Sequence, residues 1–524
     1  MRRALLACLF LAACGDDGGP AAVDAPGGGA DAPLDGSAPD APSTCGAAGP
    51  AQMMCGTECV DTSSDPMHCG SCTMTCAAGC AAGQCVPSLS TTWEKHFGGP
   101  DFGHQVAAVA VDGAGNAYIA GMFQATIDLG GGALTSAGAA DLIVASFSPS
   151  GMHRWSKRFG STASDQGAGI TVVAGKVYIT GEFSGTVDFG GGAKTALGSG
   201  DVFVLVLDAT TGTYSTAFTF GGTTSDAGIG IVADATGNIT VGGFFGPGTV
   251  DLGGGGSLTG TAGLSAFVAS FSATGTHRWS KRLSGLNANT TYNSTQSLTV
   301  DAAGNVTAAG EFSAMADFGA GPVTSAGDFD AFVVSFTPAG GHRWSRTFGA
   351  SQMDTAHGVA ADASGNIVVG GGFHSTVTFG TTSLASSGVI DGWFAILDGA
   401  TGAPRWAKKL GAASSGVVRD VGVDAQGNAI VSGDIQGAAD LGTGALSPYG
   451  VYDIFLAGFD KTAGTALFAK RYGGTDYESG NTVAITPGGA MALGGYFRAT
   501  VDLGTGTPII GGARDNGYVM MIAR

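Results

Sequence analysis

Carboxylate side chains are the first residues to test for chemistry, because hydrolysis of a glycosidic bond needs two matched carboxyl groups in one cleft. Between residue 91 and residue 524 the chain has four glutamates, which are Glu94, Glu182, Glu311 and Glu478. The sequence contains no Gly-x-Ser-x-Gly segment, no His-Glu-x-x-His segment and no phosphate-binding loop in a suitable context. We therefore expect no catalytic residue, no metal site and no cofactor. A hydrolase or lyase acting on polysaccharide is the alternative.

Cysteine is the second residue type that could do chemistry. Of the ten cysteines, eight lie within residues 45–85 and none lies beyond residue 85. An even number of cysteines in a short exported segment predicts disulfide bonds; the residues are Cys45, Cys55, Cys59, Cys69, Cys72, Cys76, Cys80 and Cys85. Their pairing cannot be deduced from spacing. The pair Cys69-x-x-Cys72 also permits a zinc site, for which His68 is the one nearby histidine.

A repeated unit must position whatever chemistry the rest of the chain holds. An aromatic-basic-Phe-Gly pattern recurs seven times, about every 62 residues, beginning at residues 93, 155, 217, 279, 344, 406 and 468. Each unit contains four short runs rich in Val, Ile, Phe and Trp and bounded by Gly, Asn, Asp or Ser, which predicts four strands. Glycine makes up 94 of 524 residues and opposes helix formation.

The connections between these strands carry turn signals. Asp-x-x-Gly-Asn joins the first two strands in five units, at Asp112–Asn116, Asp234–Asn238, Asp301–Asn305, Asp362–Asn366 and Asp424–Asn428. That spacing predicts a tight hairpin whose glycine takes the left-handed conformation, which a residue without Cβ adopts at no steric cost. Metal ligation is the alternative for the aspartates, and one carboxylate per turn makes a poor calcium site.

Seven four-stranded units predict a β-propeller, because stacked units of this kind bury their apolar faces against one another. The repeat begins with a lone fourth strand at Trp93 and ends with a third strand at residues 518–523. We therefore predict that residues 91–97 complete the seventh blade, pairing 93–97 with 518–522 and removing exposed strand edges. The fold class is an all-β, seven-bladed β-propeller (86–524) closed by the N-terminal strand and preceded by a small disulfide-rich module (45–85).

Two families resemble parts of the chain. The segments Gly-Asn-x-Tyr/Val, Phe-x-x-Thr-Val-Asp-Phe-Gly and Asp-Ala-Phe-Val-x-Ser-Phe resemble the bacterial seven-bladed propeller (SBBP) repeat, which implies a secreted or surface propeller and no particular reaction. Residues 55–76 resemble the stigma-specific-protein-like cysteine modules of bacterial surface proteins. That resemblance implies an extracellular spacer or adhesive module. The turn at Asp398–Gly402 resembles that of pyrroloquinoline-quinone-type repeats, a packing device that binds no cofactor by itself.

A candidate ligand site comes from a position, at the start of the long loops, that breaks the repeat. It holds Met122, Glu182, Gly243, Glu311, Gly372, Asp434 and Tyr496, and two residues later the units have Gln124, Ser184, Phe245, Ser313, His374, Gln436 and Arg498. These residues vary between units, whereas packing residues stay similar. Either the positions are exposed to solvent and can vary without consequence, or the variation serves binding. The binding hypothesis places a polar pocket at the mouth of the central channel, lined by Glu182, Glu311, His374, Asp434, Tyr496 and Arg498.

The N-terminus predicts export. Arg2 and Arg3 precede an apolar run that is too short for a membrane-spanning helix. Residues 11–15, Leu-Ala-Ala-Cys-Gly, resemble a bacterial lipobox, which implies a signal peptide at 1–13 and a lipid on Cys14. An ordinary signal peptide with an incidental cysteine is the alternative. By this resemblance we expect an outer-membrane lipoprotein at the cell surface, with a periplasm-facing location as the alternative. Residues 15–44 have almost no core-forming side chains. Together with the lipidated Cys14 they are expected to form an extended tether (14–44).

Charge limits the partners. The formal net charge is −18, which makes nucleic acid and anionic membrane surfaces poor partners. We expect a monomer held to the membrane by its lipid, with a non-catalytic role in binding or displaying a glycan or a protein ligand. A purely structural surface protein is the further alternative.

Overall fold

The computed structural model describes residues 52–55, 58–61, 80–81, 84–85, 88–99, 103–261, 263–284, 293–410 and 414–524. Every regular element in these residues is a β-strand, so the predicted all-β class is confirmed. The described part of the chain contains no helix of the length and apolarity that a membrane crossing requires.

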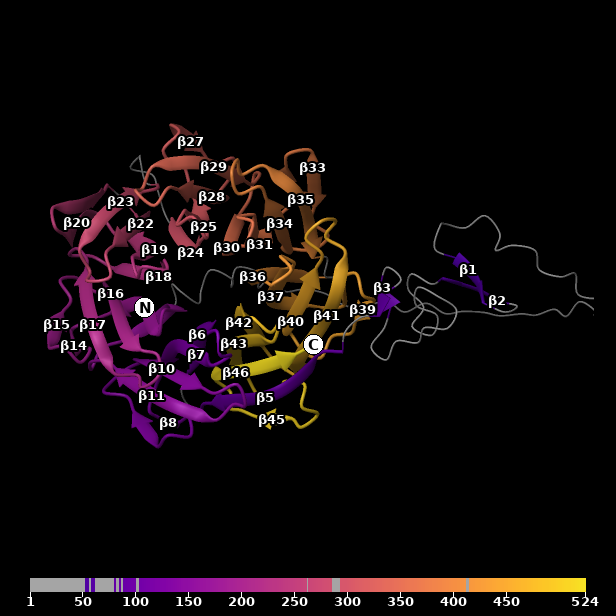
Figure 1. The fold of residues 1–524 in the computed structure, drawn as a ribbon, viewed down its shortest axis with the longest axis horizontal. Helices are drawn as coiled ribbons and strands as arrows, with labels where there is room; N and C mark the ends of the chain where they lie inside the picture. Colours follow the sequence, from indigo (N-terminus) through magenta and orange to yellow (C-terminus); the bar gives the residue numbers. More distant parts are fainter. Residues whose placement is uncertain are drawn as a thin grey trace, which may run out of the picture. The chain divides into compact units, whose positions relative to one another are not determined.

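Residues 103–524, together with one N-terminal strand, form a ring of seven four-stranded antiparallel blades (Figure 1). The innermost strand of each blade comes first in its unit: β6 (Gln105–Val111), β12 (Gln166–Val173), β18 (Asp226–Ala233), β24 (Ser294–Val300), β30 (Asp354–Ala361), β36 (Ser415–Val423) and β42 (Glu478–Ile485). The second strands are β7 (Ala117–Phe123), β13 (Lys176–Phe183), β19 (Ile239–Phe245), β25 (Val306–Phe312), β31 (Ile367–Phe373), β37 (Ala429–Gln436) and β43 (Met491–Phe497).

The third strands lie in the middle of each blade with a neighbouring blade on each face, so they are fully or almost fully buried. They are β10 (Asp141–Phe147), β16 (Asp201–Asp208), β22 (Ser265–Phe271), β28 (Asp330–Phe336), β34 (Asp391–Leu397), β40 (Asp453–Phe459) and β46 (Asn516–Ala523). The outermost strands are β11 (His153–Phe159), β17 (Tyr214–Phe220), β23 (His277–Arg282), β29 (His342–Phe348), β35 (Pro404–Leu410), β41 (Ala466–Gly474) and β5 (Ser90–Phe97).

A small hairpin interrupts each connection between the second and third strands. These hairpins are β8 (Thr126–Asp128) with β9 (Ala133–Thr135), β14 (Thr186–Asp188) with β15 (Ala193–Thr195), β20 (Gly248–Gly253) with β21 (Gly256–Gly260), β26 (Met315–Asp317) with β27 (Pro322–Thr324), β32 (Thr376–Phe379) with β33 (Thr382–Ala385), β38 (Ala439–Asp440) with β39 (Ala445–Leu446), and β44 (Thr500–Asp502) with β45 (Ile509–Ile510). They belong to the long connections, so they lie on the same side of each blade as the loops that lead to the next blade.

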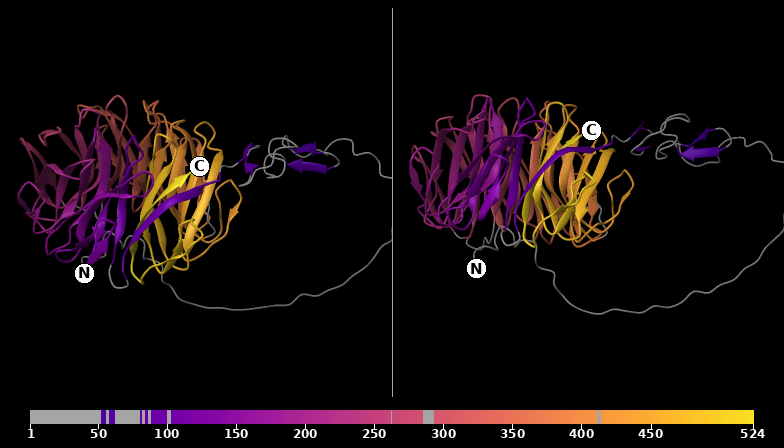
Figure 2. Two further views of the ribbon diagram at one scale, coloured as in Figure 1. Left: turned by 60° about the horizontal axis from the view of Figure 1, so that its bottom comes forward. Right: turned by 90° about the horizontal axis from the view of Figure 1, so that it is seen from below.

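The seventh blade is completed by the N-terminal strand, as predicted, and residues 93–97 pair with 517–521, one residue away from the predicted 518–522. Strand β5 pairs with β46 in antiparallel register, with Phe97 opposite Gly517 and Trp93 opposite Met521. Figures 1 and 2 show the indigo β5 lying along the yellow β46. Closure therefore leaves the last blade with the same four strands as the others.

The predicted hairpin turns have the expected geometry. In the first of them the Asp112 carboxylate accepts hydrogen bonds from the backbone N–H groups of Ala114 and Asn116, at 3.0 and 2.9 Å. Gly115 has φ of 82°, and the equivalent glycines Gly237, Gly304, Gly365 and Gly427 have φ between 80° and 85°. The aspartate oxygens are therefore used by the turn itself, as turn chemistry requires.

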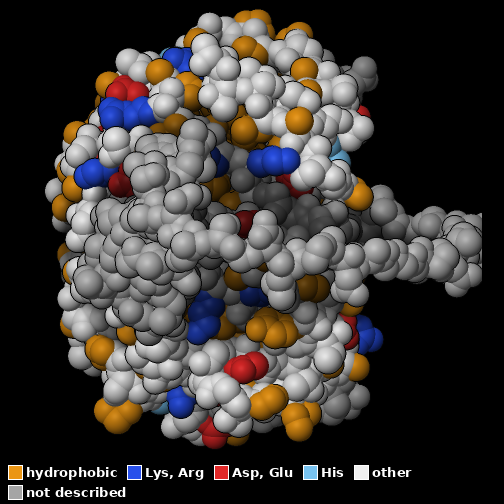
Figure 3. All heavy atoms as spheres, turned by 90° about the vertical axis from the view of Figure 1, so that its right-hand side faces the viewer, with side chains coloured by type: hydrophobic (Ala, Val, Ile, Leu, Met, Phe, Trp, Pro, Cys, Tyr) orange, Lys and Arg blue, Asp and Glu red, His pale blue; other side chains and the backbone are white. Residues whose placement is uncertain are grey.

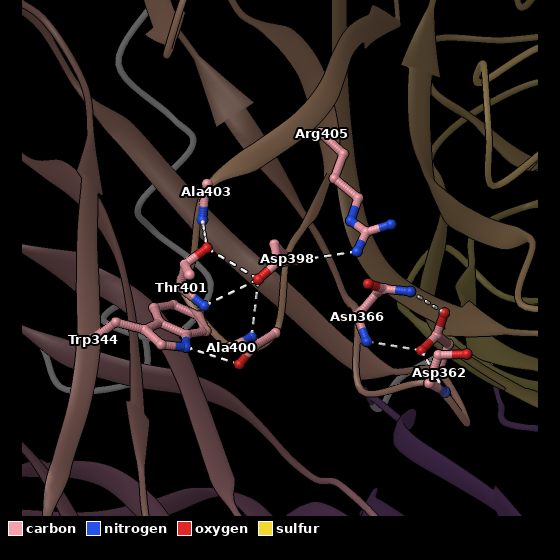
Figure 4. Close-up of polar contacts among 10 residues, drawn as sticks. Trp344, Asp362, Asn366, Asp398, Ala400, Thr401, Ala403 and Arg405 are labelled. Carbon is pink, nitrogen blue, oxygen red and sulfur yellow. Dashed lines mark hydrogen bonds and ion pairs between the residues drawn. The ribbon is translucent and has the colours of Figure 1, made fainter.

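Adjacent blades are joined by a tryptophan on the outermost strand. Its indole N–H donates to a backbone carbonyl in the last hairpin of the following blade, over 2.9 to 3.1 Å, in five pairs: Trp93–Pro149, Trp155–Ala209, Trp279–Pro338, Trp344–Gly399 and Trp406–Lys461. Figure 4 shows Trp344 beside the turn that Asp398 organises by accepting from Ala400 and Thr401. The recurrent aromatic anchor is thus an interblade contact.

A second recurrent pair links the start of the third strand to the end of the fourth. The buried Asp141 carboxylate lies against Gly160, where an added Cβ would come within 2.4 Å of Asp141 Cγ. Asp201 with Gly221, Asp330 with Gly349 and Asp453 with Gly473 repeat the contact. In the third blade both partners change together, to Ser265 and Ser284, and the Ser284 hydroxyl accepts from Ala266 N–H at 2.9 Å. In the third blade a hydrogen bond between Ser284 and the backbone of Ala266 therefore replaces the aspartate–glycine contact.

Two short hairpins precede the ring in the chain: β1 (Gln52–Cys55) with β2 (Glu58–Asp61), and β3 (Cys80–Ala81) with β4 (Gln84–Cys85). In the second hairpin, Cys80 and Cys85 are opposite each other in the register. The side chains of all eight cysteines, the predicted lipid site Cys14 and the tether at 15–44 lie outside the described residues.

Candidate functional site

Each innermost strand carries a β-bulge near its beginning, and the bulge inserts one extra residue into the strand nearest the axis of the ring. These residues are half-buried, whereas the residue before each of them is buried. We call them the axial ring: Ala107, Ala168, Ile229, Gln296, His357, Arg419 and Asn481. In Figure 1 the innermost strands that bear them surround the centre of the propeller.

The axial ring is divided by polarity. Blades one to three contribute Ala107, Ala168 and Ile229, which offer no hydrogen-bonding side chain. Blades four to seven contribute an amide, an imidazole, a guanidinium and a second amide, from Gln296, His357, Arg419 and Asn481. Because the bulge recurs at one position in every blade, packing alone does not demand this difference. The polar side chains are concentrated on one side of the axis.

The sixth and seventh blades hold the most connected polar group of that side. Arg419 Nε donates to Asp434 Oδ2 at 2.7 Å, and the Ser479 hydroxyl donates to Asp434 Oδ1 at 2.7 Å. Gly480 N–H also donates to Asp434 Oδ1, at 3.1 Å. The Arg419 side chain is 26% exposed and that of Asp434 is 7% exposed, so the carboxylate orients a cation that solvent still reaches.

Tyr496 continues this polar group toward the first blade. Burial, and next the negative charge of Asp434, raise its pKa to about 12, so the phenol keeps its proton. Arg498, two residues further along, donates from Nε to Asp515 Oδ1 at 2.6 Å, and Gln105 of the first blade donates to Asp515 Oδ2 at 2.8 Å. Asp434, Tyr496 and Arg498, three of the six residues predicted from the sequence, are therefore neighbours, because the charges of Asp434 and Arg498 both act on the Tyr496 phenol; no hydrogen bond between described residues joins them to one another.

The other three predicted residues lie at separate positions around the ring. Glu182 is 3.4 Å from Gln166 and 3.2 Å from the hydroxyl of Ser225 in the next blade. Glu311 accepts from Gln296 Nε2 at 2.7 Å, and His374 Nδ1 lies 2.7 Å from the carbonyl of Met353. The structure does not join these three to Asp434, Tyr496 and Arg498 through any hydrogen bond between described residues.

Glu311 differs from the rest because its carboxyl group is buried and half satisfied. The residue is 4% exposed, and its Oε2 atom has no hydrogen-bond partner among the described residues. Burial raises the pKa of Glu311 to about 8, with the Gln296 hydrogen bond opposing that rise. A carboxyl group in this position is largely protonated near neutral pH, and it then offers an uncharged donor and acceptor.

The structure corrects the alignment of the variable position in the third blade. Gly243 pairs with Phe267 as Gly181 pairs with Phe203, so the residue equivalent to Glu182 is Phe244. The residue two positions later is Gly246 instead of Phe245. Consecutive Gly-Gly and Phe-Phe pairs leave the register ambiguous by one residue, and the strand pairing resolves it.

Sequence reasoning missed Gln296, His357, Arg419, Asn481 and Ser479. No turn residue marks the bulge, and in a strand pattern these residues look like ordinary alternating positions. Comparing the seven aligned units at the bulged residue, which is the third to fifth residue of the first strand, would have found the axial ring. In the described ranges, no three His, Cys, Asp or Glu residues cluster as metal ligands do. Blades four to seven therefore offer a set of hydrogen-bond donors and acceptors near the axis.

The comparisons with other proteins bear on the fold alone. Known protein families and curated proteins give no match to the sequence.

Among solved structures, a quinohemoprotein alcohol dehydrogenase from Comamonas testosteroni is similar at 10% identity, over 83% of this chain and 77% of that chain, with a TM-score of 0.39. BamB from Moraxella catarrhalis is similar at 10% identity, over 83% of this chain and 98% of that chain, with a TM-score of 0.32. The Dos1 propeller is similar at 10% identity, over 83% and 95% of the two chains, with a TM-score of 0.38. Scores this low carry no argument about function, and the SBBP resemblance stays an expectation.

Proposed function

We propose that the chain is an exported, lipid-anchored propeller that binds or displays a glycan or a surface protein without catalysing a reaction. The observation that supports this most is the polar group at the sixth and seventh blades, where Arg419, Asp434 and Ser479 form one hydrogen-bonded unit beside the axis. Binding residues on rigid scaffolds favour the strand ends and the loops that follow them.

Departure from the repeat supports a binding role. The tryptophan, aspartate and glycine contacts described above recur from blade to blade because packing requires them. The residues of the axial ring, and those at the variable position on the second strand, change in size, charge and polarity. The axial-ring residues are half-buried, and the variable second-strand position is buried in some blades and half-buried in others. Change of this kind at one end of the blades fits a ligand site that uses a few blades unequally.

Charge supports a neutral ligand or a protein with compensating charge. Arg419 is neutralised by Asp434, and Arg498 by Asp515, so neither cation stands alone. On the coloured part of the face drawn in Figure 3, basic and acidic side chains are interspersed among uncharged and apolar atoms. This part of the surface shows no extended cluster of lysines and arginines of the kind that a nucleic-acid footprint needs.

The test is a binding array of glycans and peptidoglycan fragments, using the full chain with Cys14→Ser so that no lipid is attached. We expect at least one ligand, and we expect the triple variant Glu311→Ala, Asp434→Ala, Tyr496→Ala to bind it about tenfold or more weakly, because one lost buried hydrogen bond costs roughly 1–3 kcal/mol. The matched control is Gln124→Ala with Ser184→Ala, at the variable loop position of blades one and two.

Three outcomes would contradict the proposal. Ligand binding that is equal in the triple variant and the wild type removes the site. Cleavage of a bound glycan, measured as new chain ends, supports the hydrolase or lyase instead. Absence of binding to glycans, peptidoglycan fragments and surface proteins alike leaves the structural role.

A further inference from the structure

Tyrosine is unevenly distributed in the chain. Six of the ten tyrosines lie between residues 449 and 518. Two of these six, Tyr472 and Tyr518, are buried in the core of the last blades. Tyr449, Tyr452, Tyr477 and Tyr496 instead lie at the long-loop side of blades six and seven, where β40, β42 and β43 begin or end.

We call three of them the tyrosine platform: Tyr452 and Tyr477, whose rings are in contact, and Tyr449, which lies three residues before Tyr452 in the chain. The rings of Tyr452 and Tyr477 are stacked, with centroids 5.2 Å apart and an interplanar angle of 25°. Their backbones also form a parallel bridge between the two blades. Tyr449, three residues before Tyr452, is 64% exposed, and its N–H donates to the buried Asp453 carboxylate at 3.2 Å. An exposed ring is thus carried on a loop with an anchored backbone.

A charge-compensated cation stands beside the platform. The guanidinium carbon of Arg498 lies 5.5 Å from the centroid of the Tyr477 ring. The same side chain donates to Asp515, which also accepts from Gln105. These contacts place planar hydrogen-bonding groups next to an aromatic face.

The fold does not require aromatic residues here. The equivalent parallel bridges among described residues join Gly200 with Ser225, Phe329 with Met353, and Ile390 with Ser415. Two of these three bridges contain no aromatic residue, and the third has a single one, Phe329. A stacked tyrosine pair at one bridge, with an exposed tyrosine three residues before Tyr452, goes beyond what closing the blade contact needs.

We infer that the tyrosine platform is a carbohydrate subsite that takes a neutral oligosaccharide. The apolar face of a sugar ring presents C–H groups with partial positive charge, which pack on the negative face of an aromatic ring. The hydroxyls around the same sugar accept and donate hydrogen bonds, which Arg498, Asp515, Gln105 and the phenols supply. An anionic glycan would meet a chain of net charge −18 whose nearby arginine is already paired.

A protein partner fits the platform less well. Stable protein interfaces bury roughly 800 Å² on each side around an apolar centre. The exposed large apolar side chains beside the stacked pair are Tyr449 and Val451, in a loop otherwise built from Ser, Pro and Gly. This inference rests on the proposed binding function and specifies the ligand class and the residues that contact it.

The experiment titrates the full chain carrying Cys14→Ser with neutral hexasaccharides of glucose, mannose, xylose and N-acetylglucosamine, one at a time, by calorimetry. We expect at least one to bind. Tyr449→Ala should weaken that binding about tenfold, since an aromatic contact contributes roughly 0.5–1.5 kcal/mol beyond the area it buries. Tyr214→Ala is the matched control, because Tyr214 is a 37% exposed tyrosine in the second blade, and it should leave the affinity unchanged.

Folding of each variant is checked by its melting temperature, and Tyr449→Ala should melt like the wild type because its ring makes no packed contact in the core. Equal affinity of Tyr449→Ala and wild type for the bound hexasaccharide overturns the inference that the platform is the subsite. If Asp434→Asn weakens binding in that case, the proposed binding function still holds. Absence of binding by every hexasaccharide also overturns the inference. Binding of a peptide or protein by the same preparation would then keep the broader proposal and remove the carbohydrate assignment.

Discussion

At the scale of single residues, the glycine that ends the turn between the third and fourth strands meets two demands at once. Gly402 has φ of 69°, and an added Cβ would lie 2.4 Å from Cε3 of Trp344. The first demand comes from the turn and the second from the neighbouring blade. The chain offers Gly380 as a comparison, because it has φ of 60° and nothing within 4 Å of an added Cβ.

We predict that Gly402→Ala destabilises the propeller more than Gly380→Ala does. Both substitutions carry the strain of a left-handed conformation, about 1 kcal/mol. Gly402→Ala adds a clash with a packed indole, which costs roughly 1–3 kcal/mol more. Urea unfolding followed by tryptophan fluorescence measures the two midpoints. Equal midpoints would show that the indole moves aside at no cost.

A second prediction at this scale concerns Glu311. Its folded-state pKa is raised to about 8, above the value of an unfolded glutamate, so its contribution to stability is complete below pH about 4.5 and is lost as pH rises through about 8. Glu311→Gln keeps the shape and removes the titration. The wild type should therefore lose stability relative to Glu311→Gln between those pH values, by on the order of 5 kcal/mol.

Melting temperatures of the two proteins at a series of pH values measure this difference. The curves should run closest together at pH 4, where Glu311 is protonated in both the folded and the unfolded chain, and this serves as the internal control. Parallel curves from pH 4 to pH 9 would contradict a buried, protonated Glu311.

At the scale of strands, the ring depends on one segment that is distant in sequence from its partner. Strand β5 forms seven paired positions with β46, and it brings Trp93 and Phe97 into a core cluster shared with the first blade. Without β5, β46 would become an exposed edge, and unpaired edge strands promote association between chains.

We predict that deleting residues 91–97 yields a destabilised chain that aggregates. The deletion removes the last strand of blade seven and two core aromatics together, and loss of a buried aromatic alone costs about 3–5 kcal/mol. Light scattering and thermal melting measure the effect. Deleting residues 15–44 instead is the control, because that segment has no core-forming run, and it should melt like the wild type. A monomeric product with an unchanged melting temperature after the 91–97 deletion would refute the role of β5.

At the scale of the whole molecule, the sequence assigns one part to anchoring and another to binding. The lipobox resemblance at residues 11–15 predicts a lipid on Cys14, and the following acidic, proline-containing segment predicts a solvated tether. The propeller residues that we propose for ligand binding belong to blades four to seven, with Gln105 of blade one beside them. Anchoring and binding should therefore be separable by mutation.

We predict that Cys14→Ser moves the protein from the membrane fraction to the soluble fraction while ligand affinity stays the same. A lipid chain supplies the membrane affinity by burying methylene groups, and a serine hydroxyl cannot carry the thioether-linked lipid. Fractionation and immunodetection measure the distribution, with Cys8→Ser as a control for a cysteine inside the predicted signal peptide. A membrane fraction unchanged by Cys14→Ser would show that something else holds the protein there.

Local sequence features determined the strands, the turns and the number of blades. Alternating apolar runs define strands because side chains on a strand point to opposite faces, and the left-handed turns need glycine at fixed places such as Gly115 and Gly365. Even ring closure could be deduced, since a repeat that begins with a fourth strand and ends with a third one has a single way to complete its last blade.

Only the tertiary structure decided which polar side chains meet. Arg419 and Ser479, and likewise Tyr452 and Tyr477, are brought together across a blade boundary by bulges and bridges that leave no mark in the strand pattern. The same holds for the register of Gly243 and Phe244, where neighbouring identical residues make two alignments equivalent until the paired strand selects one. The physical reason is that strand and turn propensities are local, whereas a binding surface depends on contacts between blades, which only the closed ring creates.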